Sequence, residues 1–197
     1  MRTAVDHREA ILQTAAKLFG RKPYHEVLMD DVAESVGIAK GTIYRYFPNK
    51  EELFGSLAIH YIELIGTQMG ELASRQASPV DRLRIMLRGF IDIVEEHNDF
   101  FKVMQRHECE LWARKYSDLL TRRTVFRDHF ASVIKEAQAA RQLKSSFDAR
   151  TAADMLLGMI RNVLQFTVPR PAPEELVEMT MQIFLQGIGT SQNGGAA

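Results

Sequence analysis

Side chains able to bind nucleic acid are concentrated in a short stretch near the start of the chain. The stretch reads KGTIYRY at 40–46, and Lys50 follows it closely. Lysine and arginine donate to guanine edges and phosphates, threonine reaches base edges, and tyrosine hydroxyls donate to phosphates. A glycine lets the backbone come close to a DNA strand. The candidate DNA-binding residues are Lys40, Gly41, Thr42, Tyr44, Arg45, Tyr46 and Lys50.

Two short helices must position these side chains. The spacing predicts helices over about 29–36 and 39–46, separated only by Gly37 and Ile38. Glycine adopts the left-handed conformation that ends a helix and turns the chain sharply. This is the helix-turn-helix arrangement, in which the second helix is presented to the DNA major groove. The apolar residues expected to hold both helices against a first helix are Val32, Ala33, Val36, Ile38, Ile43 and Phe47.

The segment ILQTAAKLF at 11–19, followed by DDVAESVGIAKGTIYRYFPNKEELF at 30–54, resembles the DNA-binding domain of the tetracycline-repressor (TetR/AcrR) family. The resemblance implies that Lys50 binds a phosphate at the start of a fourth helix, aided by the helix N-terminus. Tyr46 stands where the family often has a histidine beside the DNA backbone. The residues that the resemblance places on the groove are Lys40, Gly41, Thr42 and Tyr44.

Two positions depart from the pattern of the family. Leu28 stands where a threonine commonly caps the second helix, and Ala39 where a serine commonly caps the recognition helix. Each lost side-chain cap costs about 1 kcal/mol. We expect Asp30 and Asp31, in the first turn of the second helix, to offset the first loss through the helix dipole.

The composition excludes several classes of protein. The 197 residues include 25 lysines and arginines and 25 aspartates and glutamates, which excludes DNA binding through overall positive charge. The one cysteine, Cys109, excludes an intrachain disulfide and a cysteine-based zinc site. No catalytic acid–base pair, phosphate loop or dinucleotide motif occurs, so we expect no enzyme, cofactor or metal site. With no signal-peptide pattern and no membrane-length apolar run, we expect a cytoplasmic protein.

Apolar residues recur every three or four positions along almost the whole chain, which predicts an all-α fold of about nine helices. We expect a helix-turn-helix domain of three helices over 1–50 and an effector-binding and dimerisation domain over 51–188. A helix beginning at Asn49 is expected to link the two domains. The glycine-rich end, 189–197, is predicted to be a flexible tail.

The C-terminal part carries no motif, but its aromatic and methionine content suits a lipophilic cavity between helices. Each of these aromatic residues taken singly is more often ordinary core. Because few charges accompany the aromatic residues, the pattern favours a lipophilic effector over an anionic one. The candidate pocket residues are Phe90, Phe101, Met104, Arg106, His107, Trp112, Phe126, Asn162 and Gln165.

Two C-terminal stretches, 149–167 and 174–187, carry apolar residues on more than one side. A monomer of this size cannot easily bury all of them, so we expect a homodimer through an interface of four helices. The alternative is that both helices are buried within one subunit. The candidate interface residues are Met155, Gly158, Met159, Ile160, Val163, Ile183, Phe184 and Gly187.

Together these patterns indicate a bacterial transcriptional regulator, a repressor, that binds a pseudo-palindromic operator in double-stranded DNA as a dimer. A small lipophilic effector is expected to displace the linking helix and change the spacing of the two DNA-binding heads. Two alternatives stay open. One is an α-helical ligand-binding or enzymatic protein whose N-terminal hairpin is merely structural, and the other is a regulator that responds to a protein partner.

Overall fold

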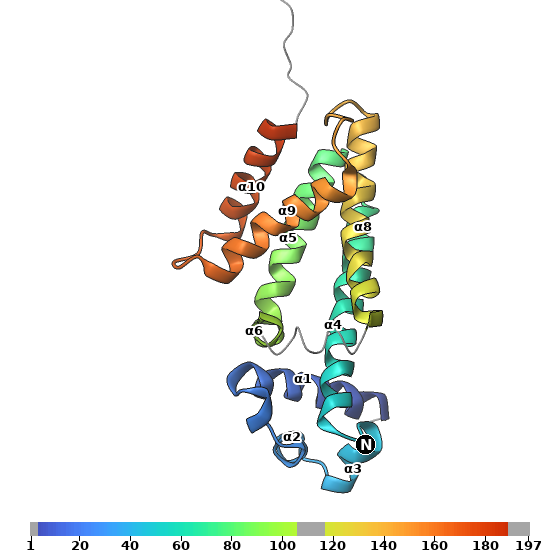
Figure 1. The fold of residues 1–197 in the computed structure, drawn as a ribbon, viewed down its shortest axis with the longest axis vertical. Helices are drawn as coiled ribbons and strands as arrows, with labels where there is room; N and C mark the ends of the chain where they lie inside the picture. Colours follow the sequence, from blue (N-terminus) through green and yellow to red (C-terminus); the bar gives the residue numbers. More distant parts are fainter. Residues whose placement is uncertain (1–3, 106–116, 189–197) are drawn as a thin grey trace, which may run out of the picture. The chain divides into compact units, whose positions relative to one another are not determined.

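Helices account for every regular element in the parts of the chain that the structure describes (Figure 1). The structure is a computed structural model, and it describes residues 4–105 and 117–188. The elements are α1 (Ala4–Arg21), the short 3₁₀ turn η1 (Tyr24–Glu26), α2 (Met29–Val36), α3 (Lys40–Tyr46), α4 (Lys50–Ala73), α5 (Pro79–Glu96), α6 (Asn98–Gln105), α8 (Ser117–Ala139), α9 (Ala149–Phe166) and α10 (Pro173–Ile188). The predicted all-α fold is confirmed. Across the described ranges, none of the helices combines the length and the hydropathy needed to cross a membrane.

The chain forms two compact units. The N-terminal unit is made of 1–64 and 94–122, and the second unit of 65–93 and 123–197. The first turns of α4 therefore belong to the N-terminal unit, and its last turns belong to the second unit. The predicted domain boundary at residue 50 stays a prediction. The predicted tail at 189–197 lies outside the described residues.

The N-terminal unit is built around one apolar core. Positions three and four apart on α1 face this core, because they lie on one side of a helix. The residues that α1 buries are Ile11, Leu12, Ala15, Ala16 and Phe19. Val32 of α2, Ile43 of α3 and Leu53 of α4 are fully buried in the same cluster. The shared core therefore sets the orientation of the three short helices.

Helix α6 packs along α1 within the N-terminal unit. A Cβ atom added at Gly20 would lie 2.9 Å from both the Cβ and the backbone oxygen of Asp99. That spacing is closer than a side-chain carbon tolerates, so this contact requires glycine. Phe101 of α6 is partly buried against the N-terminal core. The N-terminal unit thus includes a helix that is distant from it in sequence.

Side chains cap the N-termini of two of the later helices. At the start of α5, the backbone N–H of Asp81 donates to the Ser78 hydroxyl oxygen over 3.2 Å. At the start of α9, the Thr151 N–H donates to the Asp148 carboxylate over 2.8 Å, and this bond lowers the pKa of Asp148. Both arrangements are N-caps, which satisfy backbone donors that a helix leaves without partners.

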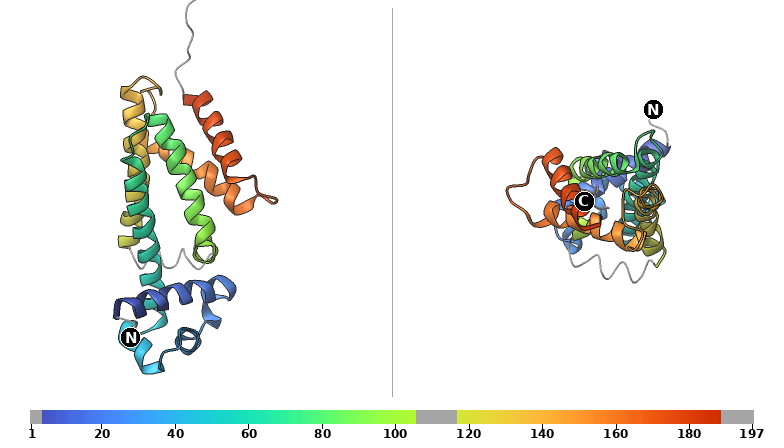
Figure 2. Two further views of the ribbon diagram at one scale, coloured as in Figure 1. Left: turned by 180° about the vertical axis from the view of Figure 1, so that it is seen from behind. Right: turned by 90° about the horizontal axis from the view of Figure 1, so that it is seen from above.

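The second unit contains α9, α10 and most of α5 and α8 (Figure 2). It combines an apolar core with ion pairs between helices. Its core includes Met86 and Phe130, which have no exposed surface. Arg84 of α5 pairs with Glu178 of α10 over 3.3 Å, and Arg88 pairs with Glu174. Arg127 of α8 pairs with Asp154 of α9 over 3.6 Å. Charged side chains therefore connect α5 to α10 and α8 to α9.

Candidate nucleic-acid interface

The turn between α2 and α3 depends on Gly37. Its φ of 77° and ψ of 35° lie in the left-handed region, where a side chain is strained. The Gly37 N–H donates to Glu34 O and the Ile38 N–H donates to Ala33 O, each over 3.0 Å. These bonds satisfy carbonyls at the end of α2 and form the turn that leads into α3. The predicted helix-turn-helix, with helices over 29–36 and about 39–46, is confirmed.

Helix α3 has one buried side and one exposed side. Ile43 is fully buried, and Phe47, directly after the helix, is almost fully buried. Thr42 and Tyr46 are half-buried, and Tyr46 packs against the N-terminal core. The exposed residues of α3 are Lys40, Gly41, Tyr44 and Arg45. Because Ile43 anchors the helix, these four residues are held at the surface with a defined orientation.

Neither α2 nor α3 has a side-chain N-cap. Leu28 and Ala39 precede the two helices in extended conformations and make no capping hydrogen bond, as predicted. Asp30 and Asp31 lie in the first turn of α2. Negative charge there stabilises a helix, because the backbone N–H groups of the first turn carry partial positive charge.

Lys40, the first residue of α3, forms an ion pair with Asp30 of α2. Its Nζ donates to the Asp30 carboxylate over 2.6 Å, and both side chains are largely exposed. The hydrogen bond to Asp30, followed by the charge of that carboxylate, raises the pKa of Lys40 above its ordinary value. Lys40 is thus fully charged near neutral pH, and an acidic side chain lies beside it.

Lys50 has partners that the sequence did not predict. Its Nζ donates to the backbone oxygens of Tyr24 over 2.8 Å, Val27 over 3.0 Å and His25 over 3.3 Å. The expected partner was a DNA phosphate. The carbonyl partners are 23 to 26 residues away in sequence, and no local pattern indicates them.

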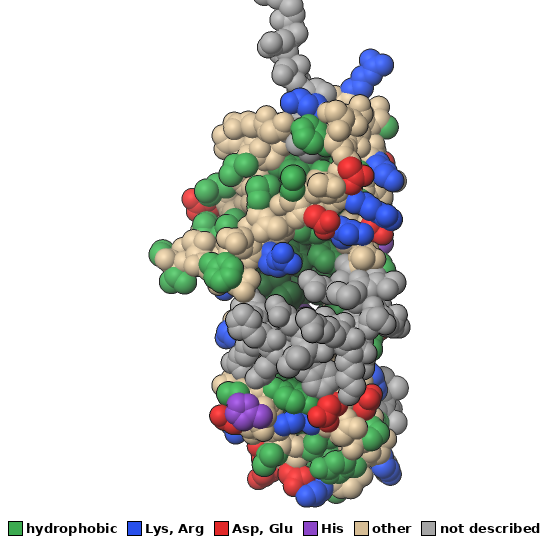
Figure 3. Space-filling model, in the orientation of Figure 1, with side chains coloured by type: hydrophobic (Ala, Val, Ile, Leu, Met, Phe, Trp, Pro, Cys, Tyr) green, Lys and Arg blue, Asp and Glu red, His purple; other side chains and the backbone are tan. Residues whose placement is uncertain are grey.

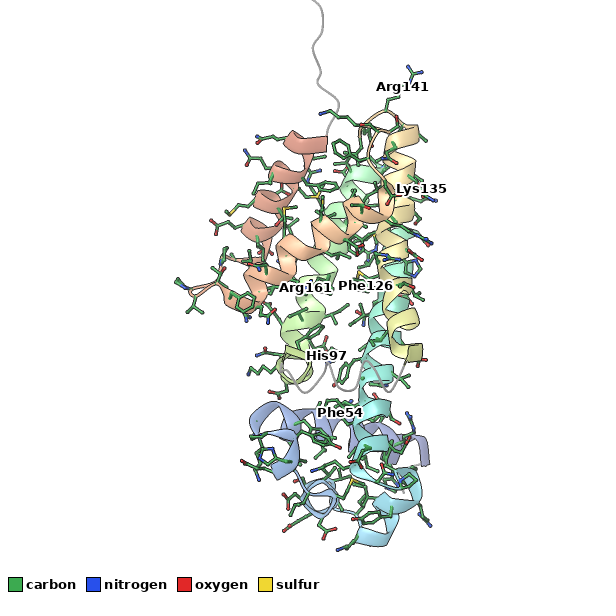
Figure 4. The ribbon with its side chains drawn as sticks, in the orientation of Figure 1. Phe54, His97, Phe126, Lys135, Arg141 and Arg161 are labelled. Atoms are coloured by element: carbon green, nitrogen blue, oxygen red, sulfur yellow. The ribbon has the colours of Figure 1, made fainter. Side chains whose placement is uncertain are left out.

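The candidate pocket residues are distributed over both units. In the second unit, Phe126 lies between α8 and α5 (Figure 4), and its ring stacks on Phe90 with the centroids 5.7 Å apart. Phe101, by contrast, packs on the N-terminal core. Asn162 is exposed and Gln165 is half-buried. Met104 falls in α6. The remaining candidates, Arg106, His107 and Trp112, lie outside the described residues.

The candidate interface residues divide into exposed and buried groups. Met155 on α9 is 62% exposed and Ile183 on α10 is 59% exposed. Gly187 is also exposed, whereas Gly158, Met159 and Val163 are half-buried. Ile160 and Phe184 differ from these residues, because both side chains are buried in the core of their own chain. They support the two helices from inside, and the interface itself stays a prediction.

Two further apolar residues on the same helices, which are not among the candidates, are also exposed. Phe166 on α9 is 68% exposed, and Met179 on α10 is 48% exposed. Figure 3 shows hydrophobic side chains on the surface of α9 and α10. The helical spacing of the sequence indicates both residues. Phe166 lies on the same side of a helix as Met155, three turns away, and Met179 lies one turn before Ile183.

Comparisons with known proteins agree with this arrangement. The family model for bacterial regulatory proteins of the tetR family matches residues 11–57. The model for the tetracyclin repressor-like C-terminal domain matches residues 76–188, which is more than half of the chain. The two models together therefore cover the helix-turn-helix and nearly all of the described second unit.

Individual relatives share only a minority of their residues with this chain. The chain is 32% identical to the uncharacterized HTH-type transcriptional regulator YuxN of Bacillus subtilis over 106 residues, spanning 54% of this chain and only 36% of that protein. It is 23% identical to the fatty acid metabolism regulator protein of Bacillus subtilis over 184 residues, or 90% and 93% of the two chains.

A solved structure has the same fold. It is AibR in complex with isovaleryl coenzyme A and operator DNA, with a TM-score of 0.74 and 22% identity over 90% of this chain and 97% of that one. With two family models matching in the expected order, this chain belongs to the tetR family of bacterial regulatory proteins and is a ligand-responsive, DNA-binding transcriptional regulator.

Proposed function

We propose that this regulator is a repressor that binds a pseudo-palindromic operator as a homodimer and is released by a lipophilic small molecule. The observation that carries the proposal is the division of α3 into a buried anchor, Ile43, and an exposed surface with Lys40, Tyr44 and Arg45. A rigidly anchored helix with exposed basic and hydroxyl groups suits insertion into the major groove.

Each exposed residue of α3 has a distinct role in this proposal. Arg45 and Lys40 donate to guanine edges or phosphates, and Tyr44 donates to a phosphate. Gly41 has open space around it, since nothing lies within 4 Å of a Cβ added there. That space lets a DNA strand approach the α3 backbone. Thr42 and Tyr46 are half-buried and reach the DNA only at the edge of the contact.

The homodimer is supported by the exposed apolar side chains of α9 and α10. Met155, Phe166 and Ile183 together expose large apolar groups to water. A second copy covers such a surface with the same surface of its own, which is the usual solution in a two-fold symmetric dimer. Two copies of α3 then read half-sites whose centres are about 34–36 Å apart.

The lipophilic effector is supported by the aromatic stack of Phe90 and Phe126 in the second unit. Two relatives add to this. One is named a fatty acid metabolism regulator, and another was solved with isovaleryl coenzyme A. Both names involve compounds with an acyl chain, which a cavity lined by aromatic and methionine side chains accommodates.

Helix α4 is the covalent link through which the effector acts. It contributes residues to both compact units. A ligand changes the DNA-binding spacing only if it binds one position of this helix more tightly than another. The extent of DNA release therefore reports how much more tightly the ligand binds one position of α4 than the other.

Selection of bound sequences from a random library of duplex DNA tests the DNA-binding part. We expect an inverted repeat with half-site centres about 10 base pairs apart. An Arg45→Ala variant should keep its thermal stability, because Arg45 is exposed, but lose preference at one or more positions of each half-site. Enrichment of single, non-repeated sites would contradict the dimeric mode.

Titration with a panel of fatty acids, acyl thioesters and sugar phosphates tests the effector. We expect the acyl compounds to release the selected DNA and to change the fluorescence of Trp112, the one tryptophan of the chain. Release by the sugar phosphates alone would refute the lipophilic effector and leave the DNA-binding proposal intact.

A further inference from the structure

Arg82 of α5 connects three helices of the second unit. Its side chain is only 12% exposed. Its Nη1 donates to the backbone oxygen of Ala73, the last residue of α4, over 2.9 Å, and its Nη2 donates to the Glu136 carboxylate of α8. The Nε is buried, and none of the described residues accepts a hydrogen bond from it. One guanidinium group thus joins α4, α5 and α8.

The contact with Ala73 completes a cap on the C-terminus of α4. A helix leaves its last four carbonyls without partners of its own. Here the backbone N–H groups of Ser74 and Arg75 supply two of them, the Ser74 hydroxyl supplies a third, and Arg82 supplies the last. The acceptors and distances are Glu71 O at 3.2 Å, Leu72 O at 3.3 Å, Gly70 O at 2.9 Å and Ala73 O at 2.9 Å. The guanidinium also places positive charge at the negative end of the helix dipole.

Close packing holds the same turns of α4 from the side. A Cβ atom added at Gly89 of α5 would lie 2.3 Å from the Cδ1 of Leu72. One added at Gly70 would lie 3.1 Å from the ring of His129 in α8. Met69 has no exposed surface, and Figure 2 shows the last turns of α4 beside α5 and α8. The C-terminal end of α4 is therefore both capped and tightly packed within the second unit.

We propose that Arg82 is a positioning residue that fixes the C-terminal end of α4, and that an effector changes DNA affinity only while this end is fixed. This inference rests on the proposed function, in which α4 carries the effect of the ligand. A packed helix transmits a displacement only if its end in the ligand-binding unit does not yield. Without Arg82, local opening of the last turn absorbs the displacement, and the ligand no longer prefers one position of α4.

The variant Arg82→Met removes the guanidinium and keeps an unbranched side chain. We expect the Tm to fall by about 2–6 °C, because Ala73 O and Glu136 lose their donor. The readout that separates positioning from stability is the ratio of the DNA dissociation constants with and without saturating decanoyl coenzyme A, an acyl thioester. This ratio should be about ten or more in the unmodified protein and below about two in Arg82→Met. The affinity for decanoyl coenzyme A without DNA should change less than about threefold.

Arg88→Met is the matched control, because Arg88 lies on the same helix but pairs with Asp92 and with Glu174 of α10. It should leave the ratio of dissociation constants unchanged. An unchanged ratio in Arg82→Met, or an equal fall in both variants, would overturn the proposal, since Arg82 would then act on stability alone. If decanoyl coenzyme A released no DNA from the unmodified protein, the proposed lipophilic effector would fail, and hydrogen exchange would still test the fixed end of α4.

Hydrogen exchange on the unmodified protein covers the case in which Arg82→Met does not fold. The ends of helices ordinarily open more readily than their centres. We expect the backbone amides of 69–75 to exchange within about tenfold of those around Met86, a fully buried residue of α5, because the end of α4 is fixed. Exchange about a hundredfold faster than at Met86 would refute the fixed end and with it the positioning role of Arg82.

Discussion

The two units expose different chemistry at their surfaces. The N-terminal unit has an apolar interior and charged side chains around α3, where Lys40 pairs with Asp30 at the surface. The second unit uses ion pairs such as Arg84 with Glu178 to connect its helices and leaves apolar side chains exposed on α9 and α10. Exposed ion pairs are weak and exchange readily for phosphates, whereas exposed apolar surface is covered by another apolar surface. The difference fits the two partners that we propose, DNA for the N-terminal unit and a second copy of the chain for the second unit.

The largest expected effect tests the apolar surface of the second unit. Ile183→Asp places a charge on each copy of the proposed dimer, and we expect it to weaken self-association by about 3 kcal/mol, or more than a hundredfold. Sedimentation velocity over a range of concentrations measures this. Gln182→Asp adds the same charge at the neighbouring exposed position and should leave the dimer intact. A monomeric unmodified protein would refute the proposed dimer.

Two glycines test how tightly the N-terminal unit is packed. Gly20→Ala brings a methyl group within 2.9 Å of Asp99 atoms, including a backbone oxygen, and should destabilise the protein by about 1–3 kcal/mol. Gly41→Ala meets no atom within 4 Å and should stabilise α3 by about 0.5–1 kcal/mol. Thermal unfolding measures both. Equal Tm changes in the two variants would contradict the close contact between α1 and α6.

The Gly41→Ala variant also has a DNA-binding readout. Its added methyl group lies on the exposed side of α3 and should weaken binding to duplex DNA even though the Tm rises. A higher Tm together with a lower affinity for DNA would support a surface at Gly41 that is shaped to contact DNA. Unchanged affinity would show that no DNA strand approaches Gly41 closely.

A smaller effect concerns the charges around α3. Asp30→Asn removes the carboxylate that pairs with Lys40, and we expect affinity for a mixed-sequence duplex to rise about two- to fivefold. The slope of log K against log salt concentration should stay unchanged, because Lys40 contacts the DNA in both proteins. Glu34→Gln removes the same charge one turn further along α2. An equal gain in both variants would mean that only the overall charge matters.

The smallest effect is a pH dependence within the N-terminal unit. Burial, followed by the charges of Arg8 and His97, lowers the pKa of His60, and Glu9 and Glu63 act against this. The folded state therefore holds the neutral imidazole more strongly than the unfolded chain, whose value is near 6.5. Stability from this group is complete above that pH and is lost as the pH falls below it.

Thermal unfolding between neutral and mildly acidic pH measures the contribution of His60. The Tm of the unmodified protein should fall on acidification, and His60→Gln should reduce part of that fall. An identical pH dependence in the variant would show that the His60 proton uptake does not differ between the folded and unfolded chain.

Much of the N-terminal unit was predictable from local pattern. The positive φ at Gly37 and the burial of Ile43 follow from the residue type and the helical spacing alone. The missing caps at Leu28 and Ala39 were also readable, because capping depends on one side chain and the next turn of backbone. The second unit was less predictable. Ile160 and Phe184 are as apolar as Met155 and Ile183, yet they face inward.

The sequence by itself determined the all-helical fold, the place of the turn between α2 and α3 and the residues exposed on α3, because each depends on residues within one or two turns. Only the tertiary structure decided which side of α9 and α10 is buried and which groups surround Lys50. The carbonyls of Tyr24, His25 and Val27 reach the ammonium through folding of the chain between η1 and α4. Backbone acceptors are present at every residue, so their convergence on one side chain has no signature in the sequence.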